Sequence, residues 1–154
     1  MKSIKQEFDK LIKLYPKKIL YSNLISKRDI DLLENKLNII LPEEFKIYLT
    51  NYKLNLFNSD FDILSIKEII EETNFIRSLE RDKNFLVISR YDDFILSINL
   101  SSKGKNGWCK IFEVNPDCED YKLACDNLYD FLEEIIRGDI EWEDEVNKEE
   151  KDKP

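Results

Sequence analysis

The sequence predicts an α+β fold: a single domain with an antiparallel, mostly meander β-sheet packed by helices. Apolar residues recur at helical spacing up to Ile76 and alternate like a strand from Phe85 onward, and strands clustered in this way favour an antiparallel sheet. The length of 154 residues is typical of one domain with one core. A composition of 42% apolar and 36% charged residues suits a folded chain better than a disordered one.

Two helices are predicted first. An apolar stripe over residues 4–15 indicates an amphipathic helix that ends near Pro16. A second helix begins at Ser26, which forms a capping-box pattern with Asp29 ahead of a new apolar stripe.

A third helix begins in the stretch LPEEF. Pro42 fits the first helical position, because its missing N–H would be unpaired there in any case. Glu43 and Glu44 place negative charge at the positive end of the helix dipole. Ile40 is expected to pack against Phe45 as a hydrophobic staple.

The second half of the chain predicts most of the sheet. Residues 54–65 contain a turn signal and predict a small hairpin, and Ser65 with Glu68 caps a fourth helix. Three strands follow, at residues 85–89, 94–100 and 108–114, with links short enough to make neighbours antiparallel. After an acid-rich loop, a last helix is expected over residues 128–136, ended by Gly138. Residues 1–138 are thus the predicted domain, and residues 139–154 an acidic, flexible tail.

Four segments of the chain stand in a definite order and spacing. They are ISKRDIDLLENKLNIILPEEFKIYL, FLVISRYDDFILSINL, WCKIFEV and the closing helix LACDNLYDFLEEII. Together they resemble the SUKH superfamily, the Smi/Knr-type domain, from Ile25 to Ile136. The resemblance implies an SMI/KNR-like fold and a role in binding rather than catalysis. Bacterial members resemble antidotes that bind polymorphic toxins, often nucleases, and block their active sites. Fungal members are signalling and scaffold proteins.

The residue inventory also argues against an enzyme. The chain has no histidine, which removes histidine-based general bases, nucleophile dyads and histidine metal sites. Cys109, Cys118 and Cys125 have neither zinc-site spacing nor an even count, so we expect reduced thiols. Asp92 and Asp93 are neighbours at an exposed hairpin tip, where nothing raises a carboxyl pKa. We therefore predict no catalytic residue, no metal and no cofactor.

Charge is distributed unevenly along the chain. The net charge is −8, with +3 over residues 1–112 and −11 over residues 113–145, so nucleic-acid binding is disfavoured. No apolar run is long enough to span a bilayer, and the N-terminal residues lack the apolar core of a secretory signal. A cytoplasmic protein that does not engage membranes is the expectation.

Candidate contacts with a partner lie in two acidic segments and at one tryptophan. The acidic loop residues are Asp117, Glu119 and Asp120, which would attract a basic surface; the alternative is a loop that only aids solubility. Trp108 is a candidate anchor, or else a sheet residue packed beneath a helix. In the tail, the candidates are Glu141, Trp142, Glu143 and Asp144, unless that segment is disordered.

These expectations combine into one functional hypothesis. The chain is expected to be an immunity protein, a monomer or weak dimer, that neutralises a cognate basic toxin by occluding it, with a nuclease as the toxin class that this hypothesis names. The alternative is a non-enzymatic interaction or scaffold module with an endogenous cell-wall or signalling partner.

Overall fold

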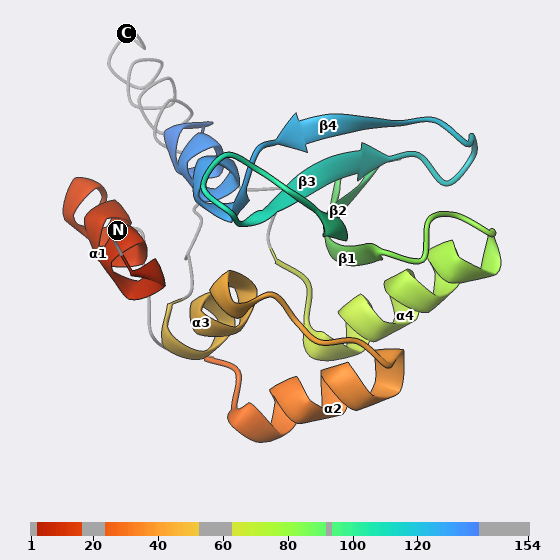
Figure 1. Cartoon of the computed structure of the whole chain (residues 1–154), viewed down its shortest axis with the longest axis horizontal. Coiled ribbons are helices and arrows are strands. Elements are labelled where there is room, and N and C mark those ends of the chain that lie inside the picture. Colours follow the sequence, from red (N-terminus) through yellow and green to blue (C-terminus); the bar gives the residue numbers. More distant parts are fainter. Residues whose placement is uncertain (1–2, 17–23, 53–62, 92–93, 139–154) are drawn as a thin grey trace, which may run out of the picture.

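The computed structural model describes residues 3–16, 24–52, 63–91 and 94–138 (Figure 1). Helices come first: α1 (Ile4–Leu14), α2 (Lys27–Leu37), α3 (Glu43–Asn51) and α4 (Ile66–Ser78). The strands follow as β1 (Phe85–Tyr91), β2 (Phe94–Lys103), β3 (Cys109–Val114) and β4 (Tyr121–Cys125). A closing helix occupies residues 128–138. The sheet is an antiparallel meander in the order β1-β2-β3-β4, which confirms the predicted fold class.

Strand β4 is the main departure from the sequence-based expectation of three strands. Its residues were assigned to the acidic loop and, from the family resemblance, to the start of the closing helix. Instead, Tyr121 pairs with Val114 and Leu123 with Phe112, while the helix begins only after Asn127. The side-chain oxygen of Asn127 accepts the Asp130 N–H at 2.9 Å and so caps that helix.

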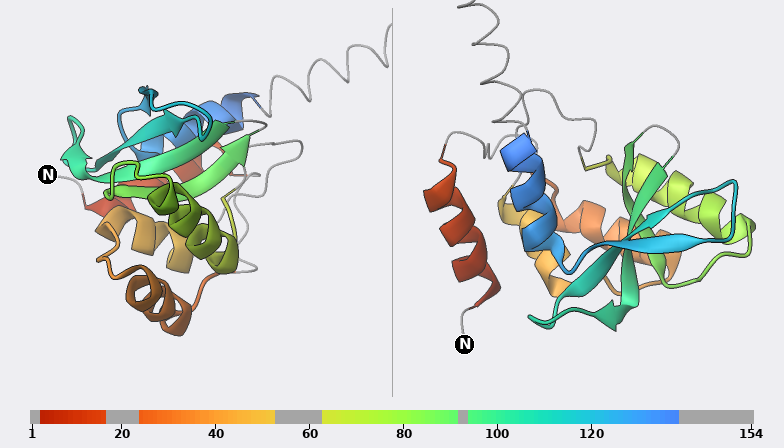
Figure 2. Two further views of the ribbon diagram at one scale, coloured as in Figure 1. Left: turned by 90° about the vertical axis from the view of Figure 1, so that its right-hand side faces the viewer. Right: turned by 90° about the horizontal axis from the view of Figure 1, so that it is seen from above.

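The main core lies between the sheet and the helices. Figure 2 shows the closing helix running beside α1, and α3 below the strands. Leu33 of α2, Phe45 of α3, Leu86 of β1 and Leu132 of the closing helix are all fully buried in this one cluster. A second cluster joins α4 to β1 through Ile76 and its neighbours. The predicted hairpin of residues 54–65 falls almost entirely outside the described residues, as does the tail of residues 139–154.

The local helix signals were mostly correct. Ser65 and Glu68 form a complete capping box, and the Ser26 side chain accepts the Asp29 N–H, although only in one direction. The predicted staple between Ile40 and Phe45 is wrong, because Ile40 is 82% exposed. Leu41 enters the core in its place.

Leu41 is held there by a carboxylate from α2. Its N–H donates to Oε2 of Glu34 at 2.8 Å, which fixes the turn that leads into α3. Pro42 follows as the residue just before the helix, so α3 begins one position later than predicted. This turn directs the first residues of α3 toward the sheet.

The burial of Glu44 follows from that direction of the chain. Glu44 lies in the first helical turn as predicted, and it is only 5% exposed, which the sequence did not indicate. Its Oε1 accepts the backbone N–H of Cys109 at 2.9 Å, at the first residue of β3. A buried N–H without such an acceptor would be costly, so this bond ties α3 to the start of β3.

The loop between β2 and β3 is fixed by a close approach to the chain ahead of the closing helix. A side chain at Gly104 would overlap the backbone oxygen and carboxylate of Asp126. The next residue, Lys105, donates its N–H to the Asp126 carboxylate at 2.9 Å. Gly107 has a positive φ of 84°, which favours glycine. This loop needs glycine at both positions.

We predict that Glu44→Ala destabilises the fold by about 1–3 kcal/mol, because it leaves the buried Cys109 N–H without an acceptor. Glu44→Gln keeps a carbonyl oxygen at that place and is expected to lose less. Equilibrium denaturation with urea measures both. Glu43→Ala is the matched control, since Glu43 is exposed at the adjacent position. Equal losses for Glu43→Ala and Glu44→Ala would contradict the assigned role of the bond.

Candidate functional site

The acidic loop, residues 115–120, joins β3 to β4 and brings the three predicted acids together. Asp117, Glu119 and Asp120 are all exposed there. Asn115 shapes the loop: its side-chain oxygen accepts the Asp117 N–H at 2.8 Å, and its backbone oxygen accepts the Cys118 N–H at 3.3 Å. Such a side-chain turn is a local property of asparagine, and it holds the acids at one end of the sheet.

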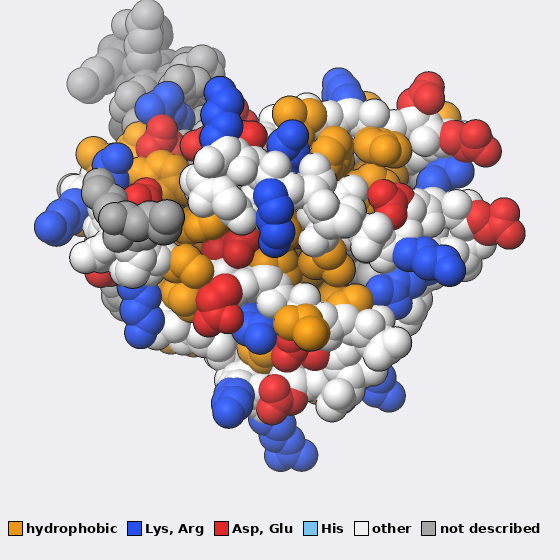
Figure 3. Space-filling model, in the orientation of Figure 1, with side chains coloured by type: hydrophobic (Ala, Val, Ile, Leu, Met, Phe, Trp, Pro, Cys, Tyr) orange, Lys and Arg blue, Asp and Glu red, His pale blue; other side chains and the backbone are white. Residues whose placement is uncertain are grey.

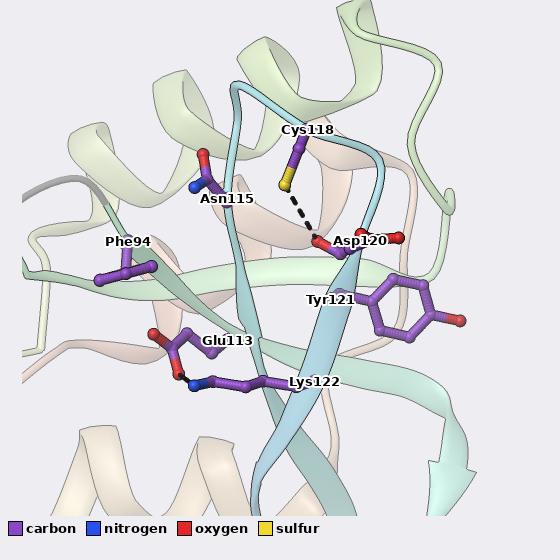
Figure 4. Close-up of a pocket in the computed structure, with 7 residues that line it drawn as sticks. All are labelled: Phe94, Glu113, Asn115, Cys118, Asp120, Tyr121 and Lys122. Atoms are coloured by element: carbon purple, nitrogen blue, oxygen red, sulfur yellow. Dashed lines mark hydrogen bonds and ion pairs between the residues drawn. The ribbon is translucent and has the colours of Figure 1, made fainter.

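A shallow hollow of about 240 Å³ lies beside this loop. Its lining residues come from β2, β3, β4 and the loop: Phe94, Glu113, Asn115, Cys118, Asp120, Tyr121 and Lys122 (Figure 4). The Glu113 carboxylate pairs with Lys122 Nζ at 3.3 Å. Carboxylates beside the apolar ring of Phe94 suit a basic side chain, whose charged end and apolar stem need different surroundings.

Tyr121 borders the hollow, but its ring lies on the opposite face of the hairpin, which is apolar. In Figure 4 the Tyr121 ring points away from Glu113 and Lys122. It packs edge-on against Phe85 and Phe112, with ring centroids 5.1 and 5.5 Å away. Tyr121 and Leu123 are nevertheless each 51% exposed. Figure 3 shows hydrophobic side chains along the top of this view, over the strands, with acidic ones toward its upper right.

Trp108 does not belong to this surface. It is 7% exposed and its ring lies 5.4 Å from that of Phe8 in α1, so the structure places it in the core beneath a helix. That is the alternative which the sequence left open. The tail candidates Glu141, Trp142, Glu143 and Asp144, and the pair Asp92–Asp93, lie outside the described residues.

The three cysteines are free thiols in different surroundings. Burial raises the pKa of Cys125 to about 12, helped by its hydrogen bond to the Glu134 carboxylate at 3.3 Å. Burial also raises the pKa of Cys109, and the Lys103 ammonium, 3.2 Å from its sulfur, opposes that rise. Cys118 is exposed in the acidic loop.

In the described part of the chain, the structure has neither a cluster of metal ligands nor a helix that could span a membrane. No group of three or more cysteine, aspartate or glutamate side chains there is arranged to hold a metal ion. None of the helices in the same residues has the length and apolarity to cross a membrane.

Sequence reasoning found the acidic residues and missed the apolar ones beside them. Phe94 of β2 and Tyr121 and Leu123 of β4, on either side of β3, are exposed large hydrophobic side chains. The alternation of Tyr121 and Leu123 around Lys122 was a signal for a strand, but the surrounding acids masked it. Together the loop, the hollow and these side chains form the candidate site, which we call the β3–β4 surface.

Alkylation with iodoacetamide at pH 8 is predicted to label only Cys118 in the native protein and all three cysteines in guanidinium. A raised folded-state pKa means that the fold favours the neutral Cys125 thiol. That contribution to stability is complete below the ordinary value of 9.0 and is lost as the pH rises toward about 12. Mass spectrometry counts the labels, and Cys118→Ser should leave the native protein unlabelled. Rapid native labelling of Cys125 would contradict this geometry.

The model of the SMI1 / KNR4 family (SUKH-1) matches residues 24–134, well over half of the chain. A search of curated proteins found no match. The matched range contains α2, α3, α4, all four strands and most of the closing helix, while α1 precedes it. The chain therefore belongs to the SMI1 / KNR4 family (SUKH-1), as the resemblance of its four segments predicted.

Proposed function

We propose that this protein is an immunity protein that binds a cognate bacterial toxin and neutralises it by occlusion, without catalysis of its own. The observation that carries the proposal is the family match over residues 24–134, because the resemblance implies an antidote role for bacterial members. The same family also includes signalling and scaffold proteins, so an endogenous partner is the alternative that the test must separate.

The β3–β4 surface supports a binding role. It offers apolar side chains, Tyr121 and Leu123, next to a loop of three exposed acids. Apolar and aromatic anchors supply most of the affinity at protein interfaces, while a charged rim sets the association rate and the choice of partner. An acidic rim selects a basic partner, and a nuclease has a basic surface because it binds phosphates.

Capture of the tagged full chain from its native cytosol tests the function directly. A stoichiometric bound protein is expected to survive a moderate salt wash and to be toxic when expressed alone. Co-expression of this protein should restore growth. A captured cell-wall or signalling protein without toxicity, or a toxin that still kills in the presence of this protein, would contradict the proposal.

Charge reversal tests the surface assigned to that function. The triple change Asp117→Lys, Glu119→Lys and Asp120→Lys is expected to slow association with the captured toxin by about tenfold or more at low salt. The dependence of the association rate on salt should also weaken. Stopped-flow or surface-immobilisation kinetics over a range of salt concentrations measures both effects.

A matched triple variant keeps the change of net charge and moves it elsewhere. Asp31→Lys, Glu43→Lys and Glu71→Lys alter exposed positions on α2, α3 and α4. This control is expected to retain most of the association rate. If both triple variants slow association equally, net charge alone is responsible and the acidic loop is not the contact.

A further inference from the structure

The two edges of the sheet differ in how they are closed. On the outer side of β1, Ile63 forms a bridge with Ser89, and the Leu64 N–H donates to the Ile88 oxygen at 2.9 Å. On the outer side of β4, none of the described residues pairs with the strand. Figure 1 shows β4 at the border of the sheet away from α2 and α4. Alternate N–H and C=O groups of such an edge point outward and are available to another strand.

The side chains of β4 alternate between the two faces of the sheet, as pairing with an additional strand requires. Tyr121 and Leu123 share the apolar face, and Phe112 and Phe85 support the Tyr121 ring from beneath. Lys122 points to the other face, toward Glu113 and the hollow. A strand laid along β4 would therefore place alternate residues against an apolar strip and against the hollow, whose lining includes Glu113 and Asp120.

Both ends of β4 are acidic. Asp120 precedes the strand and lines the hollow, and Asp126 follows it directly. Pairing of β4 with a second copy would bring the acids of one copy against those of the other and would set one Lys122 near the other. Like charges opposite each other destabilise strand pairs. The same charges attract an extended segment with basic ends and an apolar centre.

We propose that β4 is the docking edge for an extended, basic-ended segment of the partner protein, which joins the sheet as a fifth strand. This inference rests on the proposed function and deepens it, because it assigns the partner a recognition element. The segment presents two apolar side chains to Tyr121 and Leu123, an uncharged one opposite Lys122, and basic residues beside Asp120 and Asp126.

A capped heptapeptide, Lys-Lys-Val-Thr-Val-Lys-Lys, is the probe for this edge. Nuclear magnetic resonance of the isotope-labelled full chain should show shifted backbone amides in β4 as the peptide is added. Hydrogen exchange of the outward amides of β4 should slow by roughly tenfold near saturation, because a new strand protects them. Two control peptides carry N-methyl groups on the central three residues or glutamate in place of lysine, and neither should protect β4.

A matched pair of protein variants tests the same contact from the other side. Leu123→Lys is expected to weaken peptide binding about tenfold or more through lost apolar contact and added repulsion. Leu32→Lys makes the same change at another exposed leucine, 45% exposed on α2, and should leave binding unchanged. Native-like spectra of both variants show that the fold is retained.

Several results would overturn the inference. Equal binding of the N-methylated peptide would mean that charge alone acts, without strand pairing. Absence of β4 shifts at millimolar peptide would remove the docking edge. Concentration-dependent shifts of β4 without peptide would make a second copy the occupant. The immunity role is tested separately. If the chain binds the peptide along β4 but captures only a non-toxic partner, the immunity role is wrong and the docking edge still stands.

Discussion

The hydrogen bond from the Cys109 N–H to the Glu44 carboxylate is the constraint on which the arrangement of the sheet depends. It fixes the residue at which β3 begins against the first turn of α3. Trp108, one residue earlier, then packs on Phe8 and brings α1 onto the same core. The loop from Gly104 to Gly107 is closed against Asp126 at the same end of the sheet. The Glu44 carboxylate thus joins α3 to the β2–β3 hairpin, and Trp108 beside that bond makes the contact with α1.

That anchor lies at one end of β3, and the candidate site lies at the other. The start of β3 is buried among helices, whereas its end at Val114 leads into the exposed acidic loop. The β3–β4 surface therefore includes a strand, β3, whose other end is fixed by buried contacts with the helices. Tyr121 and Leu123 can therefore be exposed, because the buried core, and not these two side chains, stabilises the fold.

The extent to which the sequence predicts this structure follows from the range of each interaction. The capping residues Ser26 and Ser65 act within three residues, and their helices were predicted correctly. The acidic loop was visible from local composition for the same reason. Glu44 meets a partner 65 residues away, so nothing near it in the chain indicated that it would be buried.

Strand β4 illustrates the other limit. Prediction of strands relies on a buried face, and β4 exposes Tyr121 and Leu123 on one face and Lys122 on the other. Its pairing with β3 depends on tertiary contacts, which the periodicity of a single sequence does not reveal. Trp108 was ambiguous for a related reason, because a tryptophan serves equally well in a core and at an interface. The residues that the sequence left undecided are those whose role depends on what lies across the sheet.

Hydrogen exchange of the protein, free and in complex with the toxin that the proposed function expects, tests the central proposal that it acts by binding through the β3–β4 surface. We expect slowed exchange on complex formation to be concentrated in residues 115–125, with α2 and α4 unchanged. Protection confined to α2 and α4, with the acidic loop and β4 exchanging as in the free protein, would contradict it.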